Sequence, residues 1–428
     1  MVIILKWKDW DLNLKIRLLG EGVINILFWM YFPFMSIYFA ESFGKVTAGM
    51  LLIVSQLFGV FANLLGGYLA DHIGRKKMMV SSYVGAGSAF VLFAFANSPW
   101  YNSPILTFVA FSLLGIFSML YWPASHAMVA DIVPEQHRNA VFAVFYTAIN
   151  ITVVIGPLLG SLFFFQYRFE LLLTGMMISF VFAFILWKYI RETAPKKHVI
   201  SQQRGGKRPW YEYVKDQVSS YRIITTDKVF LLFIIAGILV AQTFMQLDLL
   251  IAVYVSEMVP DQTLFSYTIT GEKLFGILIS ENGLLVALFT VVMTRWMSRY
   301  KEKSVFIGSA VTYGIGMILF AHSMNMFFLM FAMLIFTIGE LMVVGVQQGF
   351  VSKLAPEDMR GQYFAASDLR FTIGRTIAPI AIPLTTMIGF TFTFYSIAFL
   401  AFVSAIIYWK MFYLVDRQPV KQKAVVQQ

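Results

Sequence analysis

Long apolar runs recur along almost the whole chain of 428 residues. Most of them are near or above the roughly 20 residues that one helix needs to cross a bilayer. The chain is 59% hydrophobic and only 13% charged, whereas soluble domains carry about 25% charged residues. A transmembrane β-barrel is excluded, because its strands would appear as segments of about ten residues with alternating polarity. The sequence therefore predicts an all-α polytopic membrane protein.

Twelve membrane spans can be drawn, six on each side of the longest polar stretch. The predicted spans of the first half are Arg17–Ala40, Val46–Ala70, Met78–Ala96, Ile105–Ala130, Val141–Phe165 and Leu171–Tyr189. Those of the second half are Val229–Ser256, Leu274–Trp296, Val305–His322, Met326–Val351, Tyr363–Ile388 and Phe392–Phe412. We therefore predict an N-terminal six-helix bundle in residues 1–190, a cytoplasmic linker in residues 191–228 and a C-terminal six-helix bundle in residues 229–428.

The net charge of +10 is concentrated on one side of the predicted spans. Arg75–Lys77 and the linker lie on that side, while the opposite side carries only Lys45, Arg168 and Lys273. Because basic connections stay inside the cell, we expect a protein of the cell membrane with both termini cytoplasmic. No basic domain stands apart from the helices, so nucleic acid is not an expected partner.

The two halves share an internal repeat. Pro134–Arg138 after span four and Pro356–Arg360 after span ten both have the pattern Pro-Glu-x-x-Arg. At the same offset, Pro157 of span five corresponds to Pro379 of span eleven. Repeated, pseudo-symmetric six-helix halves are typical of secondary transporters, whose substrate site lies between the halves near the midplane of the membrane.

The segment Gly67–Lys77, between spans two and three, reads Gly-Tyr-Leu-Ala-Asp-His-Ile-Gly-Arg-Lys-Lys. It resembles the corresponding loop of the major facilitator superfamily almost residue for residue. The resemblance implies a conformational latch, in which Asp71 faces the start of span eleven and Arg75 pairs with Asp131. The remaining residues that we assign to this latch are Gly67, Gly74 and Arg138. An ordinary basic loop with a turn glycine is the alternative, but it does not explain Asp71, because a carboxylate at a membrane edge is costly without a partner.

Span five contains Gly156, Pro157 and Gly160. This pattern resembles part of the signature of proton-coupled drug antiporters in the same superfamily. The alternative is close helix packing through small residues around a proline kink.

Within that superfamily, three short segments resemble the LmrP-type bacterial multidrug/proton antiporters. They are Asn13–Arg17, Met245–Asp248 and Thr337–Leu341. The resemblance implies roles in proton coupling or cation binding for four acids, namely Asp71, Asp131, Asp248 and Glu340.

Ionisable residues inside the spans can also be weighed without the family. By residue count Glu340 lies near mid-membrane, where a charged carboxylate is expensive and reversible protonation is favoured. Arg375 reaches a similar depth in span eleven, so either a structural ion pair with Glu340 or a modulated proton site is consistent with the sequence. The further candidates for proton coupling or transport are Asp248, Asp368, Glu281 and Glu21. For Glu21 a local helix pair with Arg17 is an alternative, and Glu281 is also compatible with the outer interface.

Together these features predict export of a lipophilic compound, such as a cationic drug, in exchange for protons by alternating access. We expect a monomer in the lipid bilayer that uses the proton gradient and no cofactor. An exporter or symporter of a specific metabolite, sugar or peptide is an alternative, and a membrane-embedded enzyme or a channel is another. The chain lacks cysteine, which excludes thiolate chemistry, and it shows no nucleotide-binding loop, so we do not expect an enzyme.

Overall fold

The computed structural model describes residues 8, 10–194, 211, 212, 215, 227–264, 266–355 and 360–417. They form two compact units, the first from the described parts of residues 1–32 and 54–216, the second from those of 33–53 and 217–428. The second copy of the repeated motif, at Pro356–Met359, and most of the linker lie outside the described residues. The bundle boundaries given above stay a prediction.

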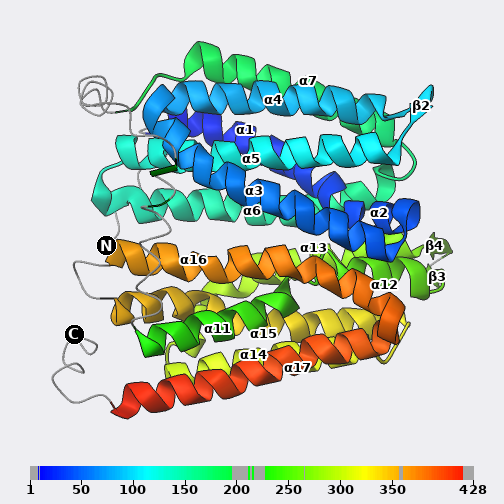
Figure 1. The fold of residues 1–428 in the computed structure, drawn as a ribbon, viewed down its shortest axis with the longest axis vertical. Helices are drawn as coiled ribbons and strands as arrows, with labels where there is room; N and C mark the ends of the chain where they lie inside the picture. Colours follow the sequence, from blue (N-terminus) through cyan, green and yellow to red (C-terminus); the bar gives the residue numbers. More distant parts are fainter. Residues whose placement is uncertain are drawn as a thin grey trace. The chain divides into compact units, whose positions relative to one another are not determined.

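The first unit is a helical bundle with one short hairpin between two of its helices. Its elements are α1 (Leu12–Tyr31), most of α3 (Lys45–Ile73), α4 (Arg75–Phe95), β1 (Asn97–Ser98), β2 (Tyr101–Asn102), α5 (Pro104–Ile132), α6 (Glu135–Phe163) and α7 (Arg168–Tyr189). Helix α4 packs against α5 and α7, and α1 packs against α6 (Figure 1). Helix α5 begins with a proline directly after Ser103, whose hydroxyl accepts the N–H of Leu106, an arrangement that favours a helix start.

The second unit begins at Pro33, inside the 3₁₀ turn η2. Its elements are η2 (Phe32–Phe34), α2 (Met35–Phe43), the start of α3, α11 (Lys228–Phe244), α12 (Leu250–Met258), β3 (Gln262–Leu264), β4 (Tyr267–Ile269), α13 (Gly271–Met297), α14 (Glu302–Phe320), α15 (Met326–Leu354), α16 (Arg360–Ile377), η4 (Ala378–Ile380) and α17 (Ala381–Arg417). Helix α14 packs against α15 and α17, and α11 packs against α16 and α17 (Figure 1). Aromatic side chains fill this core, among them Phe230, Phe233, Phe306 and Phe350.

Ten helical segments of the described chain are long and apolar enough to cross a membrane. The last runs over 52 residues to Arg417, and Gly389, with a φ of +78°, divides it into two passes. Helix α11 has only 17 residues, but it continues through a short turn into α12. Counting these two cases gives twelve passes, and the predicted all-α polytopic fold is confirmed.

Three spans that we predicted as continuous are interrupted. Span one bends at η2 around Pro33, and span eleven bends at η4 around Pro379, because proline removes a helical N–H and clashes with the preceding turn. Span seven is interrupted at residues 245–249, between α11 and α12. No proline is present there, and the interruption needs another explanation.

Candidate functional site

The interruption of span seven lies among polar groups. The Gln246 carbonyl accepts the N–H groups of both Leu249 and Ile251, at 3.3 and 3.0 Å. No hydrogen bond reaches the carbonyls of Met245 or Leu247 from any residue in the described ranges. The side chain of Gln246 bonds to the carbonyl of Gln242, and the carbonyl of Gln246 accepts two N–H groups. These bonds replace the regular ladder of backbone hydrogen bonds, and the helix therefore stops here.

Gln242 of α11 and Gln246 of the interruption attach span seven to the bend of span eleven. The Nε2 atom of Gln242 donates to the carbonyl of Gly374 at 3.2 Å. The Nε2 atom of Gln246 donates to the carbonyls of Gln242 and Ala378, at 2.9 and 3.4 Å. These amides supply hydrogen-bond donors at the bend before Pro379, where the helical ladder of span eleven is incomplete.

Span one reaches the same place through α2. The buried Ser36 hydroxyl lies 2.9 Å from the carbonyl of Asp248 and 3.1 Å from that of Pro33. The bend of span one and the interruption of span seven are therefore neighbours within the second unit. Discontinuous helices of this kind often form ion and substrate sites in transporters, because their free backbone groups face a binding cavity.

Asp248 and Arg375 interact electrostatically in this region. The Asp248 side chain is partly buried and Arg375 is exposed. No ion pair joins them at 4 Å or less in the described part of the chain. The Asp248 carboxylate is therefore open to another positive charge.

Glu340 on α15 faces α13 and not Arg375. Its Oε2 atom accepts from Nδ2 of Asn282 at 2.9 Å, and the second proton of that amide goes to Oγ1 of Thr337 at 3.0 Å. The described residues contain no ion pair between Glu340 and Arg375, so the alternative of a structural ion pair was wrong. Similar depth in the membrane fixes height along two helices but not the direction in which their side chains point.

The other predicted intramembrane acids lie in different surroundings. Glu281 precedes Asn282 on α13 and is partly buried, and its Oε2 atom has no hydrogen-bond partner among described residues. Asp368 on α16 is exposed. Its neighbour Arg370 is buried against the ring of Phe233 at 4.3 Å.

Glu21 belongs to a buried network in the first unit. Its Oε1 atom lies 2.8 Å from Nε of Arg17 and also accepts from the hydroxyls of Tyr121 and Ser125. These bonds join α1 to α5 and leave that oxygen fully occupied. The local pair with Arg17 is present, and a transport role for Glu21 stays a prediction.

The basic loop between α3 and α4 forms a second network in the first unit. Nη1 of Arg75 lies 2.6 Å from Asp71, and its Nε lies 3.3 Å from Asp131. Thr193 also donates to Asp131, at 3.2 Å. The structure therefore brings the three predicted charged residues together, whereas the predicted contact of Asp71 with span eleven stays a prediction.

Sequence reasoning missed Glu192, which caps α4 from beyond the end of α7. Its carboxylate accepts the backbone N–H groups of Arg75 and Lys76, at 2.9 and 3.2 Å. Gly74 permits this approach, since its φ is +98° and a Cβ there would overlap Oε2 of Glu192. An acidic residue directly after span six, on the side of the basic loop, was the signal in the sequence.

Among the remaining predicted motif residues, Arg138 has capping contacts and Gly156 has a packing contact. Arg138 donates to the carbonyls of Val133 and Ala130, at 3.0 and 2.7 Å, and so caps the end of α5. Gly67 lies inside α3. In α6, Gly156 sits directly against Trp29 of α1, and Pro157 and Gly160 follow in the same helix. This contact fits close packing of α1 on α6, and a role of the motif in proton-coupled antiport stays a prediction.

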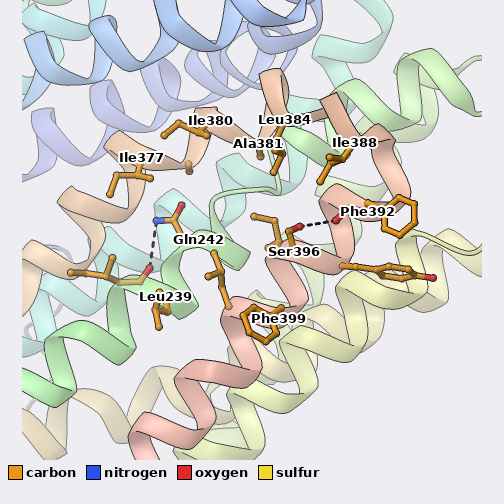
Figure 2. Close-up of a pocket in the computed structure, with 15 residues that line it drawn as sticks. Leu239, Gln242, Ile377, Ile380, Ala381, Leu384, Ile388, Phe392, Ser396 and Phe399 are labelled. Carbon is orange, nitrogen blue, oxygen red and sulfur yellow. Dashed lines mark hydrogen bonds between the residues drawn. The ribbon is translucent and has the colours of Figure 1, made fainter. Parts of the chain in front are cut away.

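An apolar pocket of about 870 Å³ opens in the second unit beside α11. Figure 2 shows Leu239 and Gln242 on one side and Ile377, Leu384 and Phe399 among the apolar side chains around it. None of the residues that line it is acidic. The pocket suits a lipophilic molecule by shape and chemistry, but it offers no counter-charge to a cation.

Comparison with known proteins gives both a family and a close relative. A family model of the Major Facilitator Superfamily matches residues 18–271 and 258–428. The chain is 55% identical to a Na(+), Li(+), K(+)/H(+) antiporter of Planococcus maritimus, over 97% of this chain and 99% of that protein. It is 30% identical to the multidrug resistance protein MdtH of Shigella flexneri, over 40% of this chain and 43% of that protein.

Solved structures show the same fold at low sequence identity. A POT family transporter in complex with 5-aminolevulinic acid has a TM-score of 0.73 at 17% identity, covering 94% of this chain and 96% of that one. A mutant form of the nucleoside transporter NupG also has a TM-score of 0.73 at 17% identity, covering 94% of this chain and 100% of that one. At this identity the likeness concerns the fold alone.

Proposed function

Since the chain belongs to the major facilitator superfamily and is a proton-coupled antiporter, we propose that it exchanges monovalent alkali-metal cations for protons. The predicted family and the predicted antiport are confirmed by these similarities. The proposed substrate differs from the lipophilic drug that we favoured from sequence. It is supported by the antiporter of Planococcus maritimus, which is 55% identical over 97% of this chain. The multidrug resistance proteins MdtH are less similar, at 30% identity over 40% of this chain or 22% over 85% of it.

The observation that carries this proposal is that two carboxylates in the second unit lack a basic partner among the described residues. Asp248 and Glu340 have no basic partner within 4 Å among the described side chains. A carboxylate inside a membrane needs a positive charge, and a proton or a metal cation supplies it equally well. Antiport requires that binding of one of these cations releases the other, so that protonation of one carboxylate and metal binding at the other exclude each other.

The two carboxylates differ in their surroundings. Glu340 accepts a hydrogen bond from Asn282, and an amide donor at this position competes with a metal cation for the same oxygen. Among the described groups, the carboxylate of Asp248 accepts only its own backbone N–H, and Asp248 directly follows Leu247, whose carbonyl accepts no hydrogen bond from the described residues. We propose that Glu340 exchanges mainly protons and that Asp248 supplies the charge for the metal cation.

The experiment is an exchange assay in inverted membrane vesicles. We propose that the protein lies in the cell membrane as a monomer with cytoplasmic termini, so such vesicles expose its cytoplasmic face. After respiration acidifies the lumen, addition of LiCl, NaCl or KCl should release part of the pH gradient, and choline chloride should not. Vesicles without the protein are the control. Equal responses to choline and to the alkali cations would refute the proposal.

Export of a lipophilic drug is a second candidate, favoured by the apolar pocket and by the multidrug relative. In the same vesicles a lipophilic dye cation would then release the pH gradient. A dye response that survives Asp248→Asn, while the sodium response is lost, would place drug transport at a different site from cation exchange.

A further inference from the structure

The interruption of span seven holds an unusual number of oxygens without hydrogen-bond partners. Oγ1 of Thr243 and Oε1 of Gln246 are buried and have no partner among the described residues, and both side chains are 0% exposed. The carbonyls of Met245 and Leu247 add two further oxygens that accept no hydrogen bond from the described chain. Four such oxygens within five consecutive residues are costly in a membrane span, where unpaired backbone groups are tolerated only beside a cavity or a bound ligand.

The chemistry of these groups favours a cation. Backbone and amide carbonyl oxygens are acceptors, and a hydroxyl oxygen presents lone pairs to a metal ion. Hard cations take such oxygens as ligands. The carboxyl end of α11, which ends at Phe244, carries the negative end of the helix dipole and points at the same place. The carbonyl oxygens among these groups would repel an anion.

The surrounding contacts fix the arrangement before any ion binds. Nε2 of Gln246 is held by the carbonyls of Gln242 and Ala378. These two hydrogen bonds fix the amide and leave Oε1 without a partner among the described residues. Ser36 in turn holds the carbonyl of Asp248. Such preorganisation lowers the cost of ordering ligands around an ion.

Resting on the function proposed above, we propose that this interruption is the binding site of the dehydrated alkali cation. Thr243, Gln246 and the free carbonyls of Met245 and Leu247 would supply neutral oxygen ligands, and Asp248 the negative charge. Arg375 interacts with Asp248 electrostatically without forming an ion pair, so it weakens the site without filling it.

The test compares two glutamines that lie one helical turn apart. Gln242→Leu and Gln246→Leu each remove an amide that donates to the bend of span eleven, but only Gln246 also carries a buried oxygen without a partner among the described residues. Thr243→Val removes the hydroxyl of that residue while keeping the shape of the side chain. Sodium-dependent proton release is measured in inverted vesicles, together with binding of radioactive sodium to the purified full-length protein.

We expect Thr243→Val and Gln246→Leu to raise the apparent KM and the Kd for sodium about tenfold, which corresponds to roughly 1.4 kcal/mol. Gln242→Leu should change both by less than about twofold, and the maximal rate at saturating sodium should stay similar. A monodisperse profile in size-exclusion chromatography confirms that each variant is folded. A folded Thr243→Val protein with unchanged sodium affinity would overturn the site while leaving alkali-cation exchange intact. Failure of the unmodified protein to respond to any alkali cation would refute the proposed function as well.

Discussion

The capping of α4 by Glu192 gives a stability prediction that can be worked out from the structure. Gly74 has φ and ψ of +98° and 155°, a region that residues with a Cβ enter only at a cost of about 1–3 kcal/mol. A Cβ at this position would also overlap the carboxylate of Glu192. Displacing that carboxylate loses its bonds to two backbone N–H groups, a capping loss of about 1 kcal/mol. Gly74→Ala should therefore destabilise the protein by about 2–4 kcal/mol.

Gly44 is a matched control for Gly74, because the backbone dihedral angles of the two residues are nearly the same. Its φ and ψ are +77° and 155°, but an added Cβ would meet nothing within 4 Å among the described residues. Gly44→Ala should therefore show the backbone cost alone. Both variants are compared by the midpoint of thermal unfolding in detergent, read as the loss of the monodisperse chromatographic peak, and Gly74→Ala should have the lower midpoint.

A double variant separates overlap from backbone strain. Glu192→Ala removes the carboxylate that the new Cβ would overlap. Its effect should therefore be smaller in the Gly74→Ala protein than in the unmodified protein, since neighbouring positions are not additive. Strictly additive midpoints, or a Gly74→Ala protein as stable as the Gly44→Ala protein, would refute the proposed contact between Gly74 and Glu192.

Three further predictions concern transport. Glu340→Gln should abolish sodium accumulation driven by a proton gradient. It should preserve exchange of labelled for unlabelled sodium, since a neutral amide resembles the protonated acid. Accumulation against a gradient in this variant would contradict the proton-binding role of Glu340. Arg375→Gln should lower the apparent KM for sodium several-fold, because it removes a positive charge that interacts with Asp248, and an unchanged or higher KM would argue against their coupling. Asp71→Asn should lower the transport rate sharply, while the abundance of the protein on an immunoblot stays unchanged. The reason is that it removes the ion pair with Arg75, in the loop that we assign to the conformational latch. Full activity of this variant would exclude Asp71 from the mechanism.

The sequence was sufficient for the spans but not for their interruptions. Apolar runs mark a span because length and hydrophobicity alone decide insertion. Pro33 and Pro379 lie at two of these interruptions, where proline removes a helical N–H, but we did not predict a bend at either of them. At residues 245–249 no such residue is present, and the polar character of Gln246 and Asp248 was the only local sign of a break. Their partners Ser36 and Ala378 are more than 100 positions away in the chain, and no local pattern identifies them.

The partners of the buried acids could not be predicted for the same reason, because they lie far away in the chain. The depth of Glu340 followed from counting residues, but its partner Asn282 lies 58 positions away on another helix. Asn282 has no charge and belongs to no motif, so nothing in the sequence distinguished it from other polar residues of a span. The loop residues Asp71, Arg75 and Asp131 were easier to relate to one another, because the motif that contains the first two resembles a known loop whose arginine pairs with an acid at the end of span four.

Helix α3 has a mechanical consequence for any movement of one unit against the other. It is a single helix of 29 residues, about 44 Å long at 1.5 Å per residue, and its residues 45–53 belong to the second unit while the rest belongs to the first. Its beginning is attached to the second unit by the ion pair of Lys45 with Glu257, at 2.6 Å, and by the close approach of Gly49 to Pro383. Because a helix resists sharp bending without a kink, a rotation between the units must detach these turns from the second unit or deform the rod. If transport rotates one unit against the other, the strength of this attachment contributes to the activation barrier, independently of the affinity for the transported ion.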